Sequence, residues 1–227
     1  EVHASTQSVY WLAEELSELY DVPFSKVQVL APYVGGGFGA KAGVQPELRM
    51  AVEIAEAAGA PVKLVYTREA EASVAGLRPG CRVDIELGAT ADGQLAGLKA
   101  KGYSDGGCSL GSSVASMMHF IYASDFKDLQ DYDVLNHGPP GKPFRGPSGP
   151  ASTFALEGAI EELAAEMGED PLSLREAWDI NVGRLRLYKV ARELPMWRDR
   201  RQGADTDEMF FIIDRNSFGT DLFQMTP

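Results

Sequence analysis

The sequence predicts an α+β fold in which helices pack on a mixed β-sheet. Hydrophobic residues make up 44% and charged residues 24% of the 227 residues, a balance that supports a buried core. Apolar residues recur every three or four positions from Val9 to Leu19, as in an amphipathic helix. Residues 81–87 instead alternate strictly between apolar and polar, as in a half-buried strand. Both periodicities in one chain of this length indicate one domain, or two small ones.

The predicted helices have recognisable ends. Pro23 stops the first, because the residue before a proline disfavours helical geometry. Pro46 suits the first position of the second helix, and Gly59 and Gly168 are typical C-terminal stops. The helices are expected over residues 8–20, 46–59, 150–167 and 171–178.

Short runs of β-branched and aromatic residues predict the sheet. Asp92-Gly93 is a hairpin turn signal between the two strands with the clearest patterns. The strands are expected over residues 26–31, 61–67, 81–88 and 94–103. Residues 104–125 and 137–150 are rich in glycine, serine or proline and predict irregular connections that converge near residues 35–39.

Charge and cysteine content exclude several classes of protein. The formal net charge of −12 argues against a nucleic-acid-binding protein, which needs a basic face. No apolar run reaches the ~18 residues that a membrane-spanning helix requires. Cys81 and Cys108 have no zinc-site spacing, and we interpret them as thiols in a reducing compartment, the cytoplasm. Because residue 1 is Glu1 and not methionine, we expect a piece of a longer protein.

The stretch from Gly35 to Lys41 is the most informative local feature. Its glycines allow a tight turn whose consecutive N–H groups could cradle an anion or an oxo group. A Walker A loop is excluded, because Ala42 follows Lys41 where serine or threonine is needed. A dinucleotide fingerprint fits loosely, with Glu53 or Glu56 near the ribose position, so a nucleotide-binding dehydrogenase module is one alternative.

A second polar candidate lies more than a hundred residues later. Arg145 stands between Phe144 and Gly146-Pro147, where the stiff backbone would hold its planar guanidinium toward an oxygen-rich ligand. A surface ion pair with a carboxylate is the other interpretation of this arginine.

Taken together, these segments resemble the molybdenum hydroxylases, the xanthine dehydrogenase/aldehyde oxidase family, in its molybdopterin-binding large subunit. The matching motifs occur in the order found in the family. They are Ser5-Thr6-Gln7, Gly35-Gly36-Gly37-Phe38-Gly39-Ala40-Lys41, Arg68-Glu69, Phe144-Arg145-Gly146 with Phe154-Ala155-Leu156-Glu157, and the helix end from Leu163 to Arg175.

The resemblance implies a cofactor-binding role and an incomplete site. Residues 1–197 would be the first half of a molybdopterin-binding domain, and residues 198–227 a divergent or truncated tail. Gln7 would hydrogen-bond an oxygen ligand of molybdenum, while the pterin, not the protein, would hold the metal. The other cofactor-binding candidates are Gly36, Gly37, Phe38, Gly39 and Arg145. The cofactor would be molybdopterin, as such or as its cytosine dinucleotide. The partners would be an iron–sulfur subunit, an FAD subunit and the remaining half of the molybdopterin-binding subunit.

Departures from the family pattern bear on the substrate. Purine-oxidising members have a glutamate where this chain has Ala42, an aromatic residue where it has Pro147, and an arginine within the region of residues 112–118, which has none. We therefore expect oxidation of aldehydes or related carbonyl or heteroaromatic substrates, with oxygen from water. No catalytic residue is assigned, since the family's glutamate base lies further downstream and Glu208 is interpreted as part of a solvated charged run. A non-catalytic remnant or assembly domain is the third hypothesis.

Overall fold

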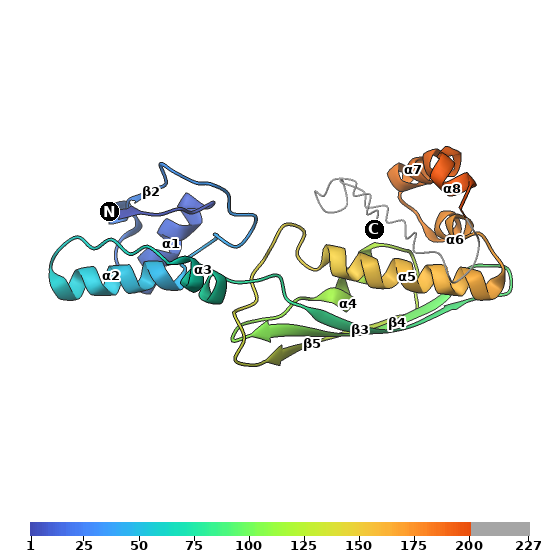
Figure 1. Cartoon of the computed structure of the whole chain (residues 1–227), viewed down its shortest axis with the longest axis horizontal. Coiled ribbons are helices and arrows are strands. Elements are labelled where there is room, and N and C mark those ends of the chain that lie inside the picture. The colour runs from blue at the N-terminus through green and yellow to red at the C-terminus, as the bar shows by residue number, and fades with distance from the viewer. Residues whose placement is uncertain (201–227) are drawn as a thin grey trace. The chain divides into compact units, whose positions relative to one another are not determined.

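The computed structural model describes residues 1–200 and divides them into two compact units (Figure 1). Unit 1 contains Glu1–Pro79, Gly106–Leu110 and Leu135–Arg145, and unit 2 contains residues 80–105, 111–134 and 146–200. The stretch 1–197, expected as one domain, contains all of unit 1 and all of the described part of unit 2 except residues 198–200. Residues 201–227 of the expected tail, Glu208 among them, fall outside the described residues.

Unit 1 is built on a two-stranded parallel sheet. Strand β1 (Val2–His3) pairs with β2 (Val29–Leu30), and helix α1 (Val9–Leu19) packs its apolar face on them. A 3₁₀ turn, η1 (Phe24–Lys26), precedes β2. Figure 1 shows α2 (Pro46–Ala58) close to α1, and the short helix α3 (Arg68–Val74) follows in the chain. Helices 8–20 and 46–59 are thus confirmed.

Two predictions for unit 1 need correction. The strand expected at 26–31 is only β2, because its partner β1 offers just two residues to pair and η1 extends to Lys26. The strand expected at 61–67 is wrong, although its side chains alternate between exposed and half-buried as a strand's would. Within residues 1–200, the backbone of residues 61–66 makes no hydrogen bond to a neighbouring strand, and a strand exists only as part of a ladder.

Unit 2 contains a three-stranded mixed sheet in the order β3-β4-β5. Strand β3 (Cys81–Ala89) pairs antiparallel with β4 (Leu95–Gly107), which confirms the hairpin. Strand β5 (Lys127–Leu135) runs in the same direction as β4, because Gly97 lies against Phe126 and the rings of Tyr103 and Tyr132 stack at 5.2 Å. The predicted α+β fold with a mixed sheet is confirmed.

One long helix covers a face of this sheet. Helix α5 (Gly149–Met167) buries Leu156 and Ile160 against Leu98 and Ala100 of β4 (Figure 1). The helix expected at 150–167 is therefore confirmed. The irregular connection expected at 104–125 is wrong in part, since β4 continues to Gly107 and α4 (Val114–Met117) and η2 (Met118–Phe120) follow.

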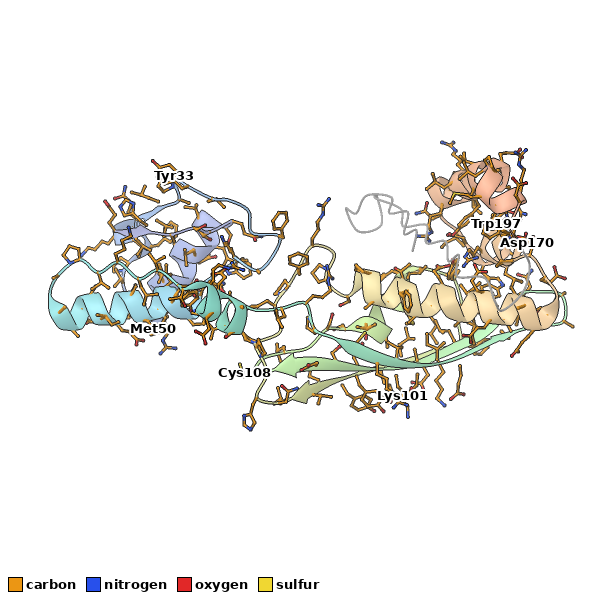
Figure 2. All side chains as sticks on the ribbon, in the orientation of Figure 1. Tyr33, Met50, Lys101, Cys108, Asp170 and Trp197 are labelled. Atoms are coloured by element: carbon orange, nitrogen blue, oxygen red, sulfur yellow. The ribbon has the colours of Figure 1, made fainter. Side chains whose placement is uncertain are left out.

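Three short helices complete unit 2. Helix α6 (Pro171–Trp178) confirms the helix expected at 171–178. Asp170 caps its N-terminus, because its carboxylate accepts the backbone N–H groups of Leu172 and Ser173. Helices α7 (Val182–Glu193) and α8 (Pro195–Arg198) were not predicted. Asp170 and Trp197 are labelled in Figure 2, and Arg200 joins them by binding Asp170 at 2.7 Å and stacking over the Trp197 ring. Among residues 1–200, no helix is both long and apolar enough to span a membrane.

Candidate cofactor site

The glycine turn follows β2 and has an unusual backbone. Gly36 and Gly39 have φ values of +132° and +105°, and Phe38 between them has +52°. Glycine is the residue that adopts such angles without strain, which explains the composition of the turn. The turn is closed by a hydrogen bond from the Ala40 N–H to the Gly37 carbonyl, at 2.9 Å. Tyr33, just before the turn, is 87% exposed (Figure 2).

The segment before α1 is hydrogen-bonded to this turn. The backbone N–H of Gln7 donates to the Lys41 carbonyl at 3.1 Å, and Thr6 Oγ1 donates to the same carbonyl at 3.0 Å. Gln7 Oε1 accepts the Gly39 N–H at 2.8 Å. Gln7 is therefore in direct contact with the glycine turn.

The Gln7 carboxamide has only one end engaged. Its oxygen accepts from Gly39, and its Nε2 amide has no hydrogen-bond partner among the described residues. A Cβ atom at Gly37 would overlap Gln7 Oε1 and lie 3.0 Å from Gln7 Cβ, so glycine is required for this close approach. The bond through Oε1 makes Nε2 the end that can donate to a ligand.

The backbone of Arg145, which lies more than a hundred residues later in the sequence, contacts the same turn. Its N–H donates to the Phe38 carbonyl at 2.6 Å, and the rings of Phe38 and Phe144 lie 6.1 Å apart. A Cβ atom at Gly39 would stand 2.9 Å from the Pro143 carbonyl oxygen, so the backbones pack closely there. Gln7, the glycine turn and the backbone of Arg145 thus meet within unit 1.

Sequence reasoning missed Arg78, which also lies here. Its Nη2 donates to the Arg145 carbonyl at 2.6 Å, and its guanidinium lies 5.2 Å from the Phe144 ring centroid. Partial burial lowers the pKa of Arg78. No local pattern in the sequence indicates it, because its partners Phe144 and Arg145 lie more than 60 positions further along the chain.

The donors of the turn fit an anionic, oxygen-rich ligand. Among residues 1–200, the N–H groups of Gly36, Gly37 and Phe38 have no hydrogen-bond acceptor. Consecutive free amides of this kind form anion-binding concavities. The Gln7 carboxamide adds a side-chain donor, so the donor set fits the oxo and phosphate oxygens of a molybdenum–pterin cofactor. No group of three or more His, Cys, Asp or Glu residues within 1–200 is arranged to hold a metal ion.

The dinucleotide fingerprint lacks its usual structural context. Such a turn leads from a strand directly into a helix, whereas α2 begins only at Pro46, well after Gly39. Glu53, one of the two ribose candidates, forms an exposed ion pair with Arg49 at 2.8 Å.

Comparisons with known proteins point to one family. Residues 1–178 match the model of the molybdopterin cofactor-binding domain. The aldehyde oxidoreductase molybdenum-binding subunit PaoC of Escherichia coli K12 is 28% identical over 181 residues, which are 78% of this chain and 24% of that protein. The xanthine dehydrogenase molybdenum-binding subunit of Escherichia coli O157:H7 is 29% identical over 178 residues, 76% of this chain and 24% of that protein.

Solved structures support the same fold. Quinoline 2-oxidoreductase from Pseudomonas putida 86 superposes with a TM-score of 0.71 at 22% identity, over 80% of this chain and 24% of that one. This chain therefore spans about a quarter of the length of these three relatives.

Proposed function

This chain belongs to the molybdopterin cofactor-binding domain family, and we propose that it forms part of the molybdenum-cofactor site of an oxidoreductase. The observation that carries the proposal is the hydrogen bond from the Gly39 N–H to Gln7 Oε1, which turns the carboxamide NH₂ into a donor beside the glycine turn. The cofactor-binding region would extend over residues 1–197, with 198–227 as a separate tail.

Each residue of the site has a distinct part. Gln7 donates from Nε2 to an oxygen ligand of molybdenum, and the backbone amides of Gly36, Gly37 and Phe38 bind further cofactor oxygens. Gly39 fixes the orientation of Gln7, and Arg145 contributes its planar guanidinium to an oxygen-rich group. The cofactor, when bound, would supply two-electron oxidation chemistry with oxygen from water. We assign no general base to this chain.

For the substrate, we propose an aldehyde or a related carbonyl or heteroaromatic compound. Ala42 and the arginine-free region 112–118 leave out groups that could hydrogen-bond a purine, and Pro147 leaves out an aromatic ring that could pack on one. A site without buried polar partners loses discrimination for a polar substrate. The names of the relatives include both xanthine dehydrogenase and aldehyde oxidoreductase and do not choose between them.

The proposed partners follow from the share of the relatives that this chain spans and from the family resemblance. Because the chain spans about a quarter of these relatives, we propose that the rest of a molybdopterin-binding subunit completes the site. From the family resemblance we propose that an iron–sulfur subunit and an FAD subunit carry the electrons away. The pterin could be present as such or as the cytosine dinucleotide. A cytoplasmic location is supported by Cys81 and Cys108, which are both unpaired and exposed (Figure 2 labels Cys108).

We predict that residues 62–66 gain a strand partner when the subunit is complete. Their backbone has no ladder within residues 1–200, and Val65 is 73% exposed in a segment of strand-like composition. Hydrogen exchange of these amides should be slowed at least about tenfold in the assembled protein compared with this chain alone. Equal exchange in both samples would contradict this mode of assembly.

Replacing Gln7 by glutamate tests the proposed function directly. A carboxylate still accepts the Gly39 N–H, so the thermal stability should be nearly unchanged. It presents an acceptor where the cofactor oxygen needs a donor, and loss of a hydrogen bond to a charged group costs about 1.5–3 kcal/mol. We expect bound molybdenum and pterin to fall about tenfold or more, measured by elemental analysis and pterin fluorescence.

Gln28→Glu is the matched control for Gln7→Glu. It makes the same charge change on an exposed glutamine of unit 1. The backbone carbonyl of Gln28 accepts the Val2 N–H, a bond that the side-chain change leaves in place. This variant should retain its cofactor. If Gln7→Glu also retains wild-type molybdenum and pterin, Gln7 does not bind the cofactor.

A further inference from the structure

We propose that Arg78 is a positioning residue that holds Arg145 in its cofactor-binding orientation. The inference rests on the proposed function for the role of Arg145, but its structural part is independent of any ligand. Arg78 precedes β3 and lies 67 positions before Arg145 in the sequence. Both residues belong to unit 1.

The backbone of Arg145 is held on both of its sides. Its N–H donates to the Phe38 carbonyl at 2.6 Å, and its carbonyl accepts Arg78 Nη2, also at 2.6 Å. One of these two bonds comes from the glycine turn and the other from a charged donor, and charge-assisted hydrogen bonds are the stronger kind. Removing Arg78 therefore releases one of the two anchors of the Arg145 backbone.

Arg78 also supports the aromatic contact beside Arg145. Its guanidinium lies 5.2 Å from the centroid of the Phe144 ring, within the range of a cation–π interaction. The opposite contact of Phe144 is the Phe38 ring at 6.1 Å. Phe38, Phe144 and Arg78 thus form a continuous set of contacts from the glycine turn to the Arg145 carbonyl.

Arg78 is itself fixed to the segment that carries Arg145. The Leu77 N–H donates to the Pro140 carbonyl at 3.0 Å, and the Lys142 N–H donates to the Leu77 carbonyl at 2.9 Å. These paired backbone bonds place the two segments in register. The Arg78 side chain therefore acts from a defined position, and the same bonds should keep the segments together when the side chain is changed.

The geometry requires arginine and not merely a positive charge. A guanidinium can donate in its own plane to the Arg145 carbonyl while it faces the Phe144 ring, whereas an ammonium lacks this planar fork. Arg78→Lys should therefore behave more like Arg78→Ala than like the wild type in cofactor retention.

The first test needs no cofactor. Hydrogen exchange of the Arg145 amide in the full chain should be at least about tenfold faster in Arg78→Ala than in the wild type, because its backbone loses one anchor. Arg82→Ala is the control, since Arg82 makes an exposed pair with Asp84 at 3.0 Å. Unchanged exchange at Arg145 in Arg78→Ala would overturn the proposal.

The second test links Arg78 to the cofactor through Arg145. In protein purified with its native partners, Arg78→Ala and Arg145→Ala should each lower bound pterin about tenfold, and the double variant should bind no less than Arg145→Ala alone. Fully multiplicative losses would show that Arg78 acts independently of Arg145 and would overturn the positioning role. If the wild type held no pterin, the proposed function would fail, and the exchange experiment would still decide the role of Arg78.

Discussion

Gly39→Ala is expected to disrupt the glycine turn and to prevent cofactor binding. The residue has a φ of +105°, where an L side chain is strained, and its Cβ would stand 2.9 Å from the Pro143 carbonyl oxygen. The backbone strain costs about 1–3 kcal/mol, and an overpacked contact costs about 1–3 kcal/mol more. Relief of the clash would move Gly39 away from Gln7 or displace the segment that leads to Arg145.

Gly80→Ala is the matched control for Gly39→Ala. No atom lies within 4 Å of a Cβ at Gly80, and its φ lies outside the strained range. Urea unfolding gives the stability of both variants, and pterin fluorescence gives their cofactor content. Gly39→Ala should be destabilised and free of pterin, while Gly80→Ala should resemble the wild type. A stable Gly39→Ala protein with a full complement of pterin would show that the turn is not part of the site.

Arg175→Met is expected to produce the largest loss of stability in unit 2. Arg175 Nε binds Glu157 Oε2 at 2.6 Å, and the two side chains are only 3% and 4% exposed. The other Glu157 oxygen accepts the Tyr122 hydroxyl, and burial followed by the charge of Glu157 raises the pKa of Tyr122 well above its ordinary value. Removal of Arg175 leaves a buried carboxylate without its cation, at a cost of about 3–5 kcal/mol in the free energy of unfolding.

The double variant Glu157→Gln with Arg175→Met separates the cost of the unpaired charge from other effects. Because the buried Glu157 charge is removed together with its cation, most of the lost stability should return. Glu161, whose side chain is 30% exposed, pairs with Arg175 at 2.8 Å and loses that partner in both variants. Arg49→Met is the control on an exposed ion pair, with Glu53 at 2.8 Å, and should change stability by less than about 1 kcal/mol. A loss below about 1 kcal/mol in Arg175→Met would show that the buried pair does not hold α5 and α6 together.

Local signals predicted the elements whose ends are chemically marked. Pro46 begins α2, and Gly59 and Gly168 end α2 and α5 in the left-handed conformation, so these helices could be placed from the sequence. The hairpin of β3 and β4 followed from alternation and its Asp92-Gly93 turn. The resemblance to molybdenum hydroxylases also rested on short local motifs, and the family model confirms it.

Elements with mixed polarity could not be predicted in this way. Strand β5 carries many polar residues, and its last four residues are all exposed. It therefore lacks the regular alternation of apolar and polar residues that predicts a strand. Helix α7 buries Arg184, which pairs with Asp179. Because arginine is usually exposed, the sequence pattern places this buried position on the solvent face of the helix. The contacts of Arg78 with Phe144 and Arg145 are tertiary, and no local pattern indicates them.

The strand expected at 61–67 failed for a different reason. Its composition and alternation are those of a strand, but hydrogen bonding to a neighbour is a property of the whole sheet and not of the segment. Within residues 1–200 that neighbour is not present.

Molybdenum and pterin analysis of the protein from its native source, with intact mass measured on the same sample, tests the cofactor-binding role most directly. We predict one pterin and one molybdenum for each copy of this chain, and retention of both when Gln28 is changed but not when Gln7 is changed. A folded native protein that contains this chain and carries neither molybdenum nor pterin would contradict the assignment and leave a non-catalytic role for the fold.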